Sequence, residues 1–209
     1  MIWHDINLII IDSESFKRDL RSVVELSFTE THKLLRKTHE ADILKAQQEK
    51  YDDNDEVNHS IRWQVEAHLE TQFEDDSRIV ATMTLAAIAS LTESYLKTLK
   101  SWFDKKRPPN AAGYKGEGAL AKLVSEYAAR FQINLDTLAG FSMVREVVFA
   151  RNALIHQAGH IEDENYLKFG PTLIDESGRV NLSPEQCSGV LKQVELFADE
   201  LATTLTELR

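Results

Sequence analysis

The sequence predicts an all-α protein, an up-and-down bundle of about five helices built as one domain over residues 1–209. Glycine and proline are scarce, at 8 and 4 residues, which favours long helices with few turns. Apolar residues recur along most of the chain at the three- and four-residue spacing of an amphipathic helix. Only short segments separate these helices, and antiparallel helices with short connections pack most simply as a bundle.

A first long helix is expected from about residue 13 to residue 48, because apolar residues recur on one of its faces. These residues are Phe16, Leu20, Val23, Val24, Leu34 and Leu35. The acidic stretch 51–56 then forms a polar loop. A second helical region is expected from about residue 58 to residue 105, and residues 74–77 mark the place where it could break. Its second half carries an apolar stripe of Leu85, Ile88, Ala89, Tyr95, Leu96, Leu99 and Phe103.

Prolines 108 and 109 end this region, because the residue before a proline disfavours α-helical geometry. A short helix is expected over about residues 119–131 and a longer one over about residues 136–157. Gly159 is placed to cap the second of them. Near residues 165–182 the pattern alternates loosely and contains turn residues, so a small hairpin or extended loop is expected there.

The last helix is expected to open at Ser183 and to reach the C-terminus. Ser183 and Gln186 have the spacing of a capping box, with Pro184 at the first helical position. Its inward positions are Val190, Val194, Phe197 and Leu201. No repeat or low-complexity linker divides the chain, and the only candidate boundary is the loop near residue 52. The acidic residues 1–80 could be an addition to the helical domain.

Composition argues against several classes of protein. The longest apolar run, Ile6 to Ile11, is too short to span a membrane. The acidic residues Asp5 and Asp12 flank it, whereas a secretory signal has a basic start. Cys187 is the only cysteine, which leaves no disulfide framework and no cysteine-based zinc site. We therefore expect a cytoplasmic protein in a reducing environment, without a membrane partner.

The charge is distributed unevenly along the chain. The formal net charge is −10, and residues 1–80 contribute −8 from 18 acidic and 10 basic residues. Residues 97–122 carry seven basic and two acidic residues, a net charge of +5. A local basic patch can attract phosphate even on an acidic protein. Lys105, Lys106 and Arg107 are therefore candidate RNA contacts, and the alternative is a solvated helix end and loop.

The most informative segment runs from Arg145 to Gly159. Its apolar residues lie on one arc of a helix and are Val144, Val147, Val148, Leu154 and Ile155. Arg151 falls in the middle of this arc. An arginine keeps its charge, so burying it is costly unless partners compensate. Arg151 therefore indicates either a functional site or a structural ion pair with a carboxylate such as Glu93 on the facing helix.

Polar side chains follow on one flank of the same helix. Asn152 and His156 are four residues apart and therefore neighbours on the helix surface. Histidine titrates near neutrality and suits proton transfer, while the Asn152 amide could orient His156 or contact a phosphate. Arg145, two turns earlier, is a candidate phosphate contact or a solvated charge. His156 and His160 have a metal-pair spacing, but Gly159 would end the helix between them, and no metal is expected.

The pattern Arg-Asn-x-x-x-His, from Arg151 to His156, resembles the R-x4-H motif of the HEPN superfamily. Many of these small all-helical domains are metal-independent ribonucleases. The resemblance covers roughly residues 80–209 and less clearly the first 80. It implies an endoribonuclease without a cofactor, with Arg151, Asn152 and His156 at the catalytic site. About 140° around the helix separates Arg151 from His156, so one helix alone makes an awkward site. The resemblance implies a homodimer in which two copies form composite sites.

The resemblance implies a toxin or phage-defence setting, with an antitoxin or other regulatory protein as a partner. In one branch of the family the motif extends to R-x4-H-x-Y, and a nucleotidyltransferase antitoxin modifies the tyrosine. Ala158 occupies that place here, which argues against that particular antitoxin. Two alternatives stay open. One is a HEPN-like module that binds a nucleotide, RNA or protein without catalysis, and the other is a helical dimer in which Arg151 is structural.

Overall fold

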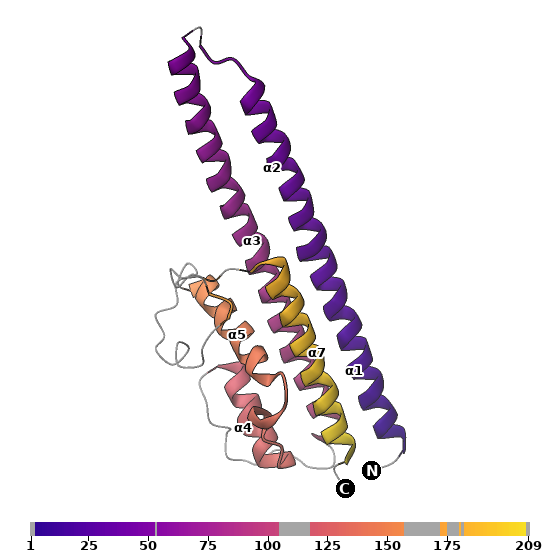
Figure 1. Ribbon diagram of the computed structural model, residues 1–209. Coiled ribbons are helices and arrows are strands. Elements are labelled where there is room, and N and C mark those ends of the chain that lie inside the picture. Colours follow the sequence, from indigo (N-terminus) through magenta and orange to yellow (C-terminus); the bar gives the residue numbers. More distant parts are fainter. Residues whose placement is uncertain are drawn as a thin grey trace.

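Five helical rods build the part of the chain that the computed structural model describes, residues 3–52, 54–104, 118–156, 172–174, 180 and 182–207 (Figure 1). The α-helices are α1 (Trp3–Val23), α2 (Thr31–Gln48), α3 (Asp55–Asp104), α4 (Ala119–Phe131), α5 (Phe141–His156) and α7 (Pro184–Glu207). No strand occurs among these residues, and the only β pairing in them is an isolated bridge between Ile174 and Val180. The predicted all-α bundle is confirmed.

The first rod is longer than expected. It begins at Trp3 and continues through α1, a π-helical segment (Val24–Glu30) and α2. A π-turn adds a residue to the helical repeat and so changes which residues face inward. Val24 and Phe28 of this segment are buried, and the Thr31 hydroxyl donates a hydrogen bond to the Leu26 carbonyl oxygen at 3.0 Å.

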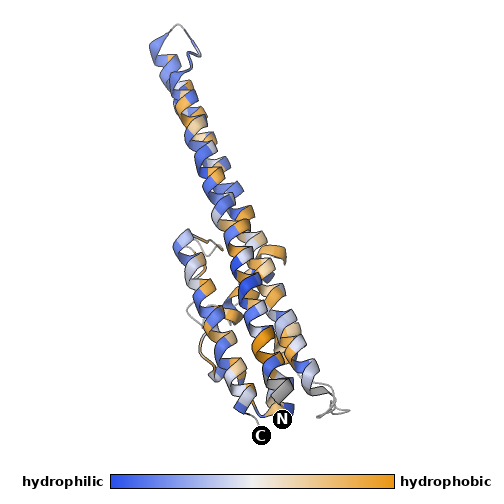
Figure 2. Cartoon of the chain, turned by 90° about the vertical axis from the view of Figure 1, so that its right-hand side faces the viewer, coloured by the Kyte–Doolittle hydropathy of each residue, from blue (hydrophilic) through white to orange (hydrophobic). Residues whose placement is uncertain are grey.

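The second rod, α3, runs unbroken through residues 74–77, so the break considered there does not occur. Arg78 and Asp75 form an ion pair of 3.1 Å one turn apart, and the Phe73 ring stacks on His39 of α2. Both contacts favour a continuous helix across this polar stretch. Figures 1 and 2 show the N-terminal half of α3 projecting with α2 as a two-helix hairpin beyond the other helices.

One described helix, α3, is long and apolar enough to cross a membrane by length and composition alone. The apolar stretch in it is longer than the Ile6–Ile11 run, so that run is not the most membrane-like segment. Half of the most apolar window of α3 is buried within the protein, and core helices of soluble proteins meet the same criteria. Packing against α1, α4 and α5 gives these apolar side chains a role in the bundle.

The bundle core lies where α1, the C-terminal half of α3, α5 and α7 pack together. Its largest fully buried side chains are Ile9, Leu20, Phe28, Leu85, Ile88, Leu96, Leu99, Tyr127, Phe131, Phe141 and Phe197. Because α1 packs on both α3 and α7, the acidic N-terminal part contributes directly to this core. The opening of α7 is as predicted. The Ser183 hydroxyl accepts a hydrogen bond from the Gln186 N–H (3.2 Å), and the Gln186 side chain accepts one from the Ser183 N–H (2.7 Å).

A buried charge cluster fixes α4 against α3. The Glu126 carboxylate accepts hydrogen bonds from Lys100 Nζ at 3.1 Å and from Arg130 at 2.5 Å. Arg130 also lies over the Phe131 ring, 5.2 Å from its centroid. A buried carboxylate is tolerated when such partners neutralise it. The bounds of α4 agree with the expected helix, and this anchoring places its first turn beside α5.

The start of α5 differs from the expectation. The helix begins at Phe141 rather than near residue 136, because a short 3-10 helix (Leu135–Thr137) and a turn at Gly140 precede it. The Asn134 side chain caps the short helix by accepting a hydrogen bond from the Asp136 N–H. The Gly159 cap and most of the hairpin expected near 165–182 lie outside the described residues.

Candidate functional site

The motif residues lie on α5, which runs through His156. Its buried face differs from the predicted arc. Ala150 and Ala153 are buried, whereas Ile155 is 54% exposed. The buried arc is therefore wider than predicted. Arg151 lies within it, between the buried Val144 and Val147 on the helix surface.

Arg151 forms the ion pair with Glu93 that was considered as the structural alternative. Arg151 Nη2 lies 2.9 Å from Glu93 Oε1, and the side chains are 25% and 14% exposed. Lys97, one turn along α3, lies 3.9 Å from the same carboxylate. Arg151 Nε is buried and has no hydrogen-bond acceptor among the described residues. The guanidinium is therefore oriented by Glu93 but keeps an unused donor.

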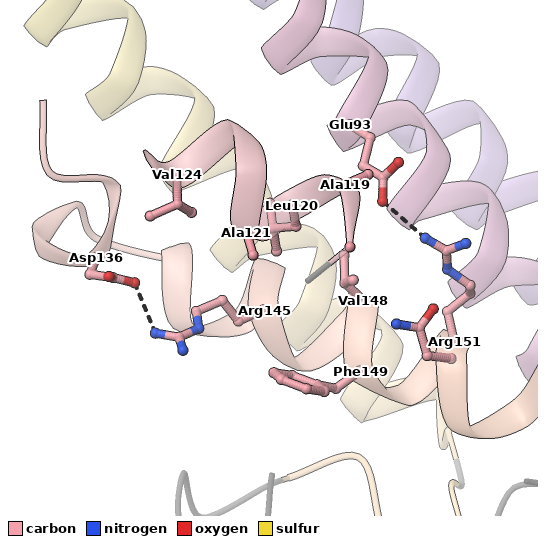
Figure 3. A pocket seen from close by; sticks show the side chains of 12 residues that line it. Glu93, Ala119, Leu120, Ala121, Val124, Asp136, Arg145, Val148, Phe149 and Arg151 are labelled. Atoms are coloured by element: carbon pink, nitrogen blue, oxygen red, sulfur yellow. Dashed lines mark hydrogen bonds and ion pairs between the residues drawn. The ribbon is translucent and has the colours of Figure 1, made fainter. Parts of the chain in front are cut away.

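A cavity of about 430 Å³ opens beside this pair, between α3, α4 and α5. It is lined by Glu93, Gly118, Ala119, Leu120, Ala121, Val124, Asp136, Arg145, Val148, Phe149, Arg151 and Asn152 (Figure 3). Three predicted site residues, Arg145, Arg151 and Asn152, therefore meet at one cavity. Glu93 and Asp136 line the same cavity and pair with the two arginines, so an anionic ligand with an apolar part would have to share or displace these carboxylates.

The two arginines lie at opposite ends of the cavity in Figure 3. Arg145 forms an ion pair of 2.8 Å with Asp136, on the short helix before α5. The sequence did not predict three parts of the site, which are Asp136, Phe149 and the first turn of α4. Asp136 and Arg145 are nine residues apart across a turn, which is not a helical spacing. The contribution of α4 depends on tertiary packing, so no local pattern predicts it.

His156 is the last residue of α5, one turn beyond Asn152, and its side chain lies outside the described part of the structure. Lys105, Lys106, Arg107 and His160 also lie outside the described residues. Among the described members of the basic segment, Lys100 is engaged by Glu126. Lys97 of the same segment is paired with Glu93, so both of its lysines on α3 have carboxylate partners.

The described side chains include no group of three or more His, Cys, Asp or Glu residues placed to hold a metal ion. Cys187 is buried, and burial raises the pKa of its thiol to about 12. The thiol therefore stays protonated near neutral pH, and a protonated thiol is a poor nucleophile. The candidate groups for catalysis are therefore the arginines, the asparagine and the histidine of α5.

Comparisons with protein-family models, curated proteins and solved structures find no match to this chain.

Replacing Arg151 by alanine is expected to lower the free energy of unfolding by about 1–3 kcal/mol, because Glu93 would stay mostly buried without its partner. Urea denaturation followed by circular dichroism measures the change. The double variant Arg151→Ala/Glu93→Gln should recover part of the loss, since a neutral amide is less costly to bury than a carboxylate. A single variant as stable as the wild type would mean that the pair contributes no net stability.

Proposed function

We propose that this protein is a metal-independent endoribonuclease of the HEPN kind. The observation that carries the proposal is the cavity at which Arg145, Arg151 and Asn152 of one helix meet, with His156 one turn further along the same helix. Cationic and amide donors at a cavity suit a phosphate diester. A histidine beside them is the group whose ordinary pKa suits proton transfer at neutral pH.

RNA cleavage by such a site needs few protein groups, because the substrate supplies its own nucleophile. His156 removes the proton from the ribose 2′-hydroxyl, and the 2′-oxygen forms a bond to phosphorus. The bond from phosphorus to the 5′-oxygen breaks, and that oxygen leaves with a proton from a protonated histidine. Arg151 donates hydrogen bonds to the phosphate oxygens as charge develops, and Asn152 holds the reacting groups in place. The products are a 2′,3′-cyclic phosphate and a 5′-hydroxyl.

The spacing of the motif supports a homodimer as the active form. Arg151 and His156 are five residues apart, so about 140° separates them around α5. A single α5 helix would present only part of a catalytic set to one phosphate. Two copies related by a two-fold axis would bring both residue types from both chains to one cleft. We place the enzyme in the cytoplasm, as a toxin or phage-defence effector restrained by an antitoxin or regulatory protein.

A non-catalytic HEPN-like module is the second candidate, and the Arg151–Glu93 ion pair favours it. The pair occupies part of the guanidinium before any substrate arrives. In this alternative, the cavity binds a nucleotide, RNA or a protein partner, and His156 has no chemical role. Helical folds of one kind can support both outcomes, so activity has to be measured.

The proposal is tested by incubating the purified full-length protein with total RNA and with a tRNA pool, in the presence and absence of EDTA. Cleavage is expected to survive EDTA, because the proposed chemistry uses no metal ion. The new ends should be 2′,3′-cyclic phosphates or their hydrolysis products. DNA, and RNA with 2′-O-methyl groups at the cut sites, should resist.

Two results would argue against this proposal. Activity that is lost in EDTA and restored by one divalent ion would establish a metal mechanism and return attention to His156 and His160. Absence of cleavage with all RNAs would favour the binding module. End mapping by ligation and sequencing distinguishes the predicted ends from those of a contaminating nuclease that leaves 5′-phosphates.

A further inference from the structure

A second hollow lies at the base of the projecting hairpin and shares no lining residue with the cavity beside Arg151. It has a volume of about 360 Å³ and lies between the π-helical segment, α2 and the start of α7. Figure 1 shows the first turns of α7 beside the first rod, and α7 packs on the π-helical segment there. We call this site the α2 hollow. Its lining residues are Phe28, Thr29, His32, Lys33, Arg36, Lys37, Glu40 and Pro184.

Three cationic side chains form a row along the α2 hollow. Arg36 and Lys37 follow Lys33 by three and four residues, so the three side chains lie on one face of α2. All three are exposed, and neither Arg36 nor Lys37 forms an ion pair or hydrogen bond with another residue in the described part of the chain. Lys33 lies 3.6 Å from Glu30, but both side chains are exposed, and such pairs contribute little. The row therefore offers cationic donors that the protein leaves largely unused.

Two carboxylates limit which ligands this row can bind. Glu40 lines the hollow, and Glu185 follows Pro184 in the first turn of α7. Hydrogen bonds from its own backbone N–H and from Ser183 lower the pKa of Glu185, and the charge of Arg36 lowers it further. Arg36 is therefore close enough to the start of α7 to interact with an anion there. The positive end of the α7 dipole favours an anion at the same place.

Neutral donors lie beside the cationic row. The His32 ring stacks on Phe28, with 5.4 Å between the ring centroids. Burial lowers the pKa of His32, and the charge of Arg36 lowers it further, so the ring is mostly neutral at pH 7 and has one N–H to donate. The exposed Thr29 adds a hydroxyl group. Guanidinium, ammonium, imidazole and hydroxyl donors at the start of a helix together suit phosphate oxygens.

We propose that the α2 hollow binds a small ligand that carries a chain of two or three linked phosphate groups, as an inorganic or nucleoside polyphosphate does. The row from Lys33 to Lys37 rises about 6 Å along α2. One phosphate is too small to contact both ends of the row, whereas linked phosphates are long enough. A ligand with a single negative charge would gain little against Glu40 and Glu185, so a multiply charged ligand is favoured. The site is separate from the proposed catalytic cavity, and its ligand binding does not require ribonuclease activity.

The test is isothermal titration calorimetry of the full-length protein with sodium tripolyphosphate and with inorganic phosphate, at one fixed low salt concentration. Tripolyphosphate is expected to bind at least about 10-fold more tightly, because it makes several charge-assisted hydrogen bonds at once. Added salt should weaken its binding, since the cationic side chains are exposed and are screened by ions. ATP, titrated in the same way, identifies the source of the phosphates. Affinity equal to that of tripolyphosphate would indicate recognition of the phosphates alone, and tighter binding would indicate a nucleoside polyphosphate.

Two charge-matched variants locate the site. Arg36→Ala/Lys37→Ala is expected to weaken tripolyphosphate binding at least about 10-fold, because it removes the two unpaired cations of the row. Arg18→Ala/Lys45→Ala removes the same two kinds of charge from exposed positions elsewhere on the first rod and should bind like the wild type. Circular dichroism verifies that both proteins are folded.

Glu185→Gln tests the sign of the effect. It removes the carboxylate that competes for Arg36 and keeps a polar side chain of similar size, so tripolyphosphate should bind about threefold more tightly. A protein that is merely less stable would not bind its ligand better. This variant therefore distinguishes a binding site from a structural role of the same residues.

Four results would overturn the inference. They are absence of tripolyphosphate binding by the wild type, equal affinity of the two double variants, weaker binding by Glu185→Gln, and binding of AMP as tight as that of tripolyphosphate. If RNA binding depended on Arg36 and Lys37 while tripolyphosphate did not bind, the inference would also fail. The α2 hollow would then be a contact for a nucleic-acid backbone.

Discussion

Replacing His156 by alanine is expected to lower the rate of RNA cleavage by at least about 100-fold, because proton transfer by a positioned side chain contributes about 10²–10⁴-fold. The same change should leave the thermal unfolding midpoint almost unaltered, since a histidine on the flank of a helix contributes little packing. Initial rates on a tRNA pool, measured at equal protein concentration, provide the comparison.

His68→Ala is a suitable control. His68 is exposed on the projecting part of α3, so this variant removes a histidine far from the cavity. It should cleave like the wild type. If His156→Ala also retained wild-type rates, then His156 would not be the proton-transfer group and the proposed mechanism would fail. If His156→Ala lost both cleavage and the folded state, the cleavage result would not test the role of His156. His156→Gln, which keeps a polar side chain at this position, would then replace it in the comparison.

Local sequence patterns predicted those parts of the fold that depend on one helix alone. The bounds of α4 and the capping box of Ser183 and Gln186 depend on residues within a few positions of each other, and both agree with the structure. The π-helical segment was not predicted, because a single added residue leaves the apolar pattern almost unchanged. The uninterrupted path of α3 through residues 74–77 depends on its packing against α2.

Local sequence patterns predicted the candidate site only in part, for the same reason. Helical periodicity relates Arg145 to Asn152, seven residues later on the same flank, and the structure brings both of them to one cavity with Arg151. Glu93 was anticipated as a partner only because a buried arginine needs a carboxylate. Tertiary packing brings Phe149 and the first turn of α4 to the cavity. The spacing of residues within α5 does not predict this packing. The orientation of α5 also depends on a residue outside the motif, Gly140.

Gly140→Ala is expected to destabilise the protein by about 3 kcal/mol or more, through a left-handed backbone and a steric clash together. Gly140 has φ +76°, a conformation that costs a side chain energy. A Cβ atom there would lie 2.0 Å from the Gln193 carbonyl oxygen and 3.0 Å from the Phe197 nitrogen. Both are backbone atoms of α7, which cannot move aside as a flexible side chain could.

Two other glycines distinguish the cost of the left-handed backbone from the cost of the steric clash. Gly118 also has a positive φ, +87°, but no atom of the described residues lies within 4 Å of its Cβ position, so Gly118→Ala should show the conformational cost alone. Gly189 lies within α7 with no atom near its Cβ position, so Gly189→Ala should be neutral or stabilising by up to about 1 kcal/mol. Urea denaturation of the three variants, followed by circular dichroism, ranks them.

Gly140 also determines where α5 begins and how closely it approaches α7, so its replacement should displace Arg145, Arg151 and Asn152 together. The Ala139 N–H next to it donates a hydrogen bond to the Glu200 carboxylate of α7, which ties the same turn to the bundle. We therefore expect any Gly140→Ala protein that remains folded to lose RNA cleavage as well as stability. Stability equal to that of Gly189→Ala would mean that α5 and α7 are not in close backbone contact, and the placement of the cavity would then be wrong.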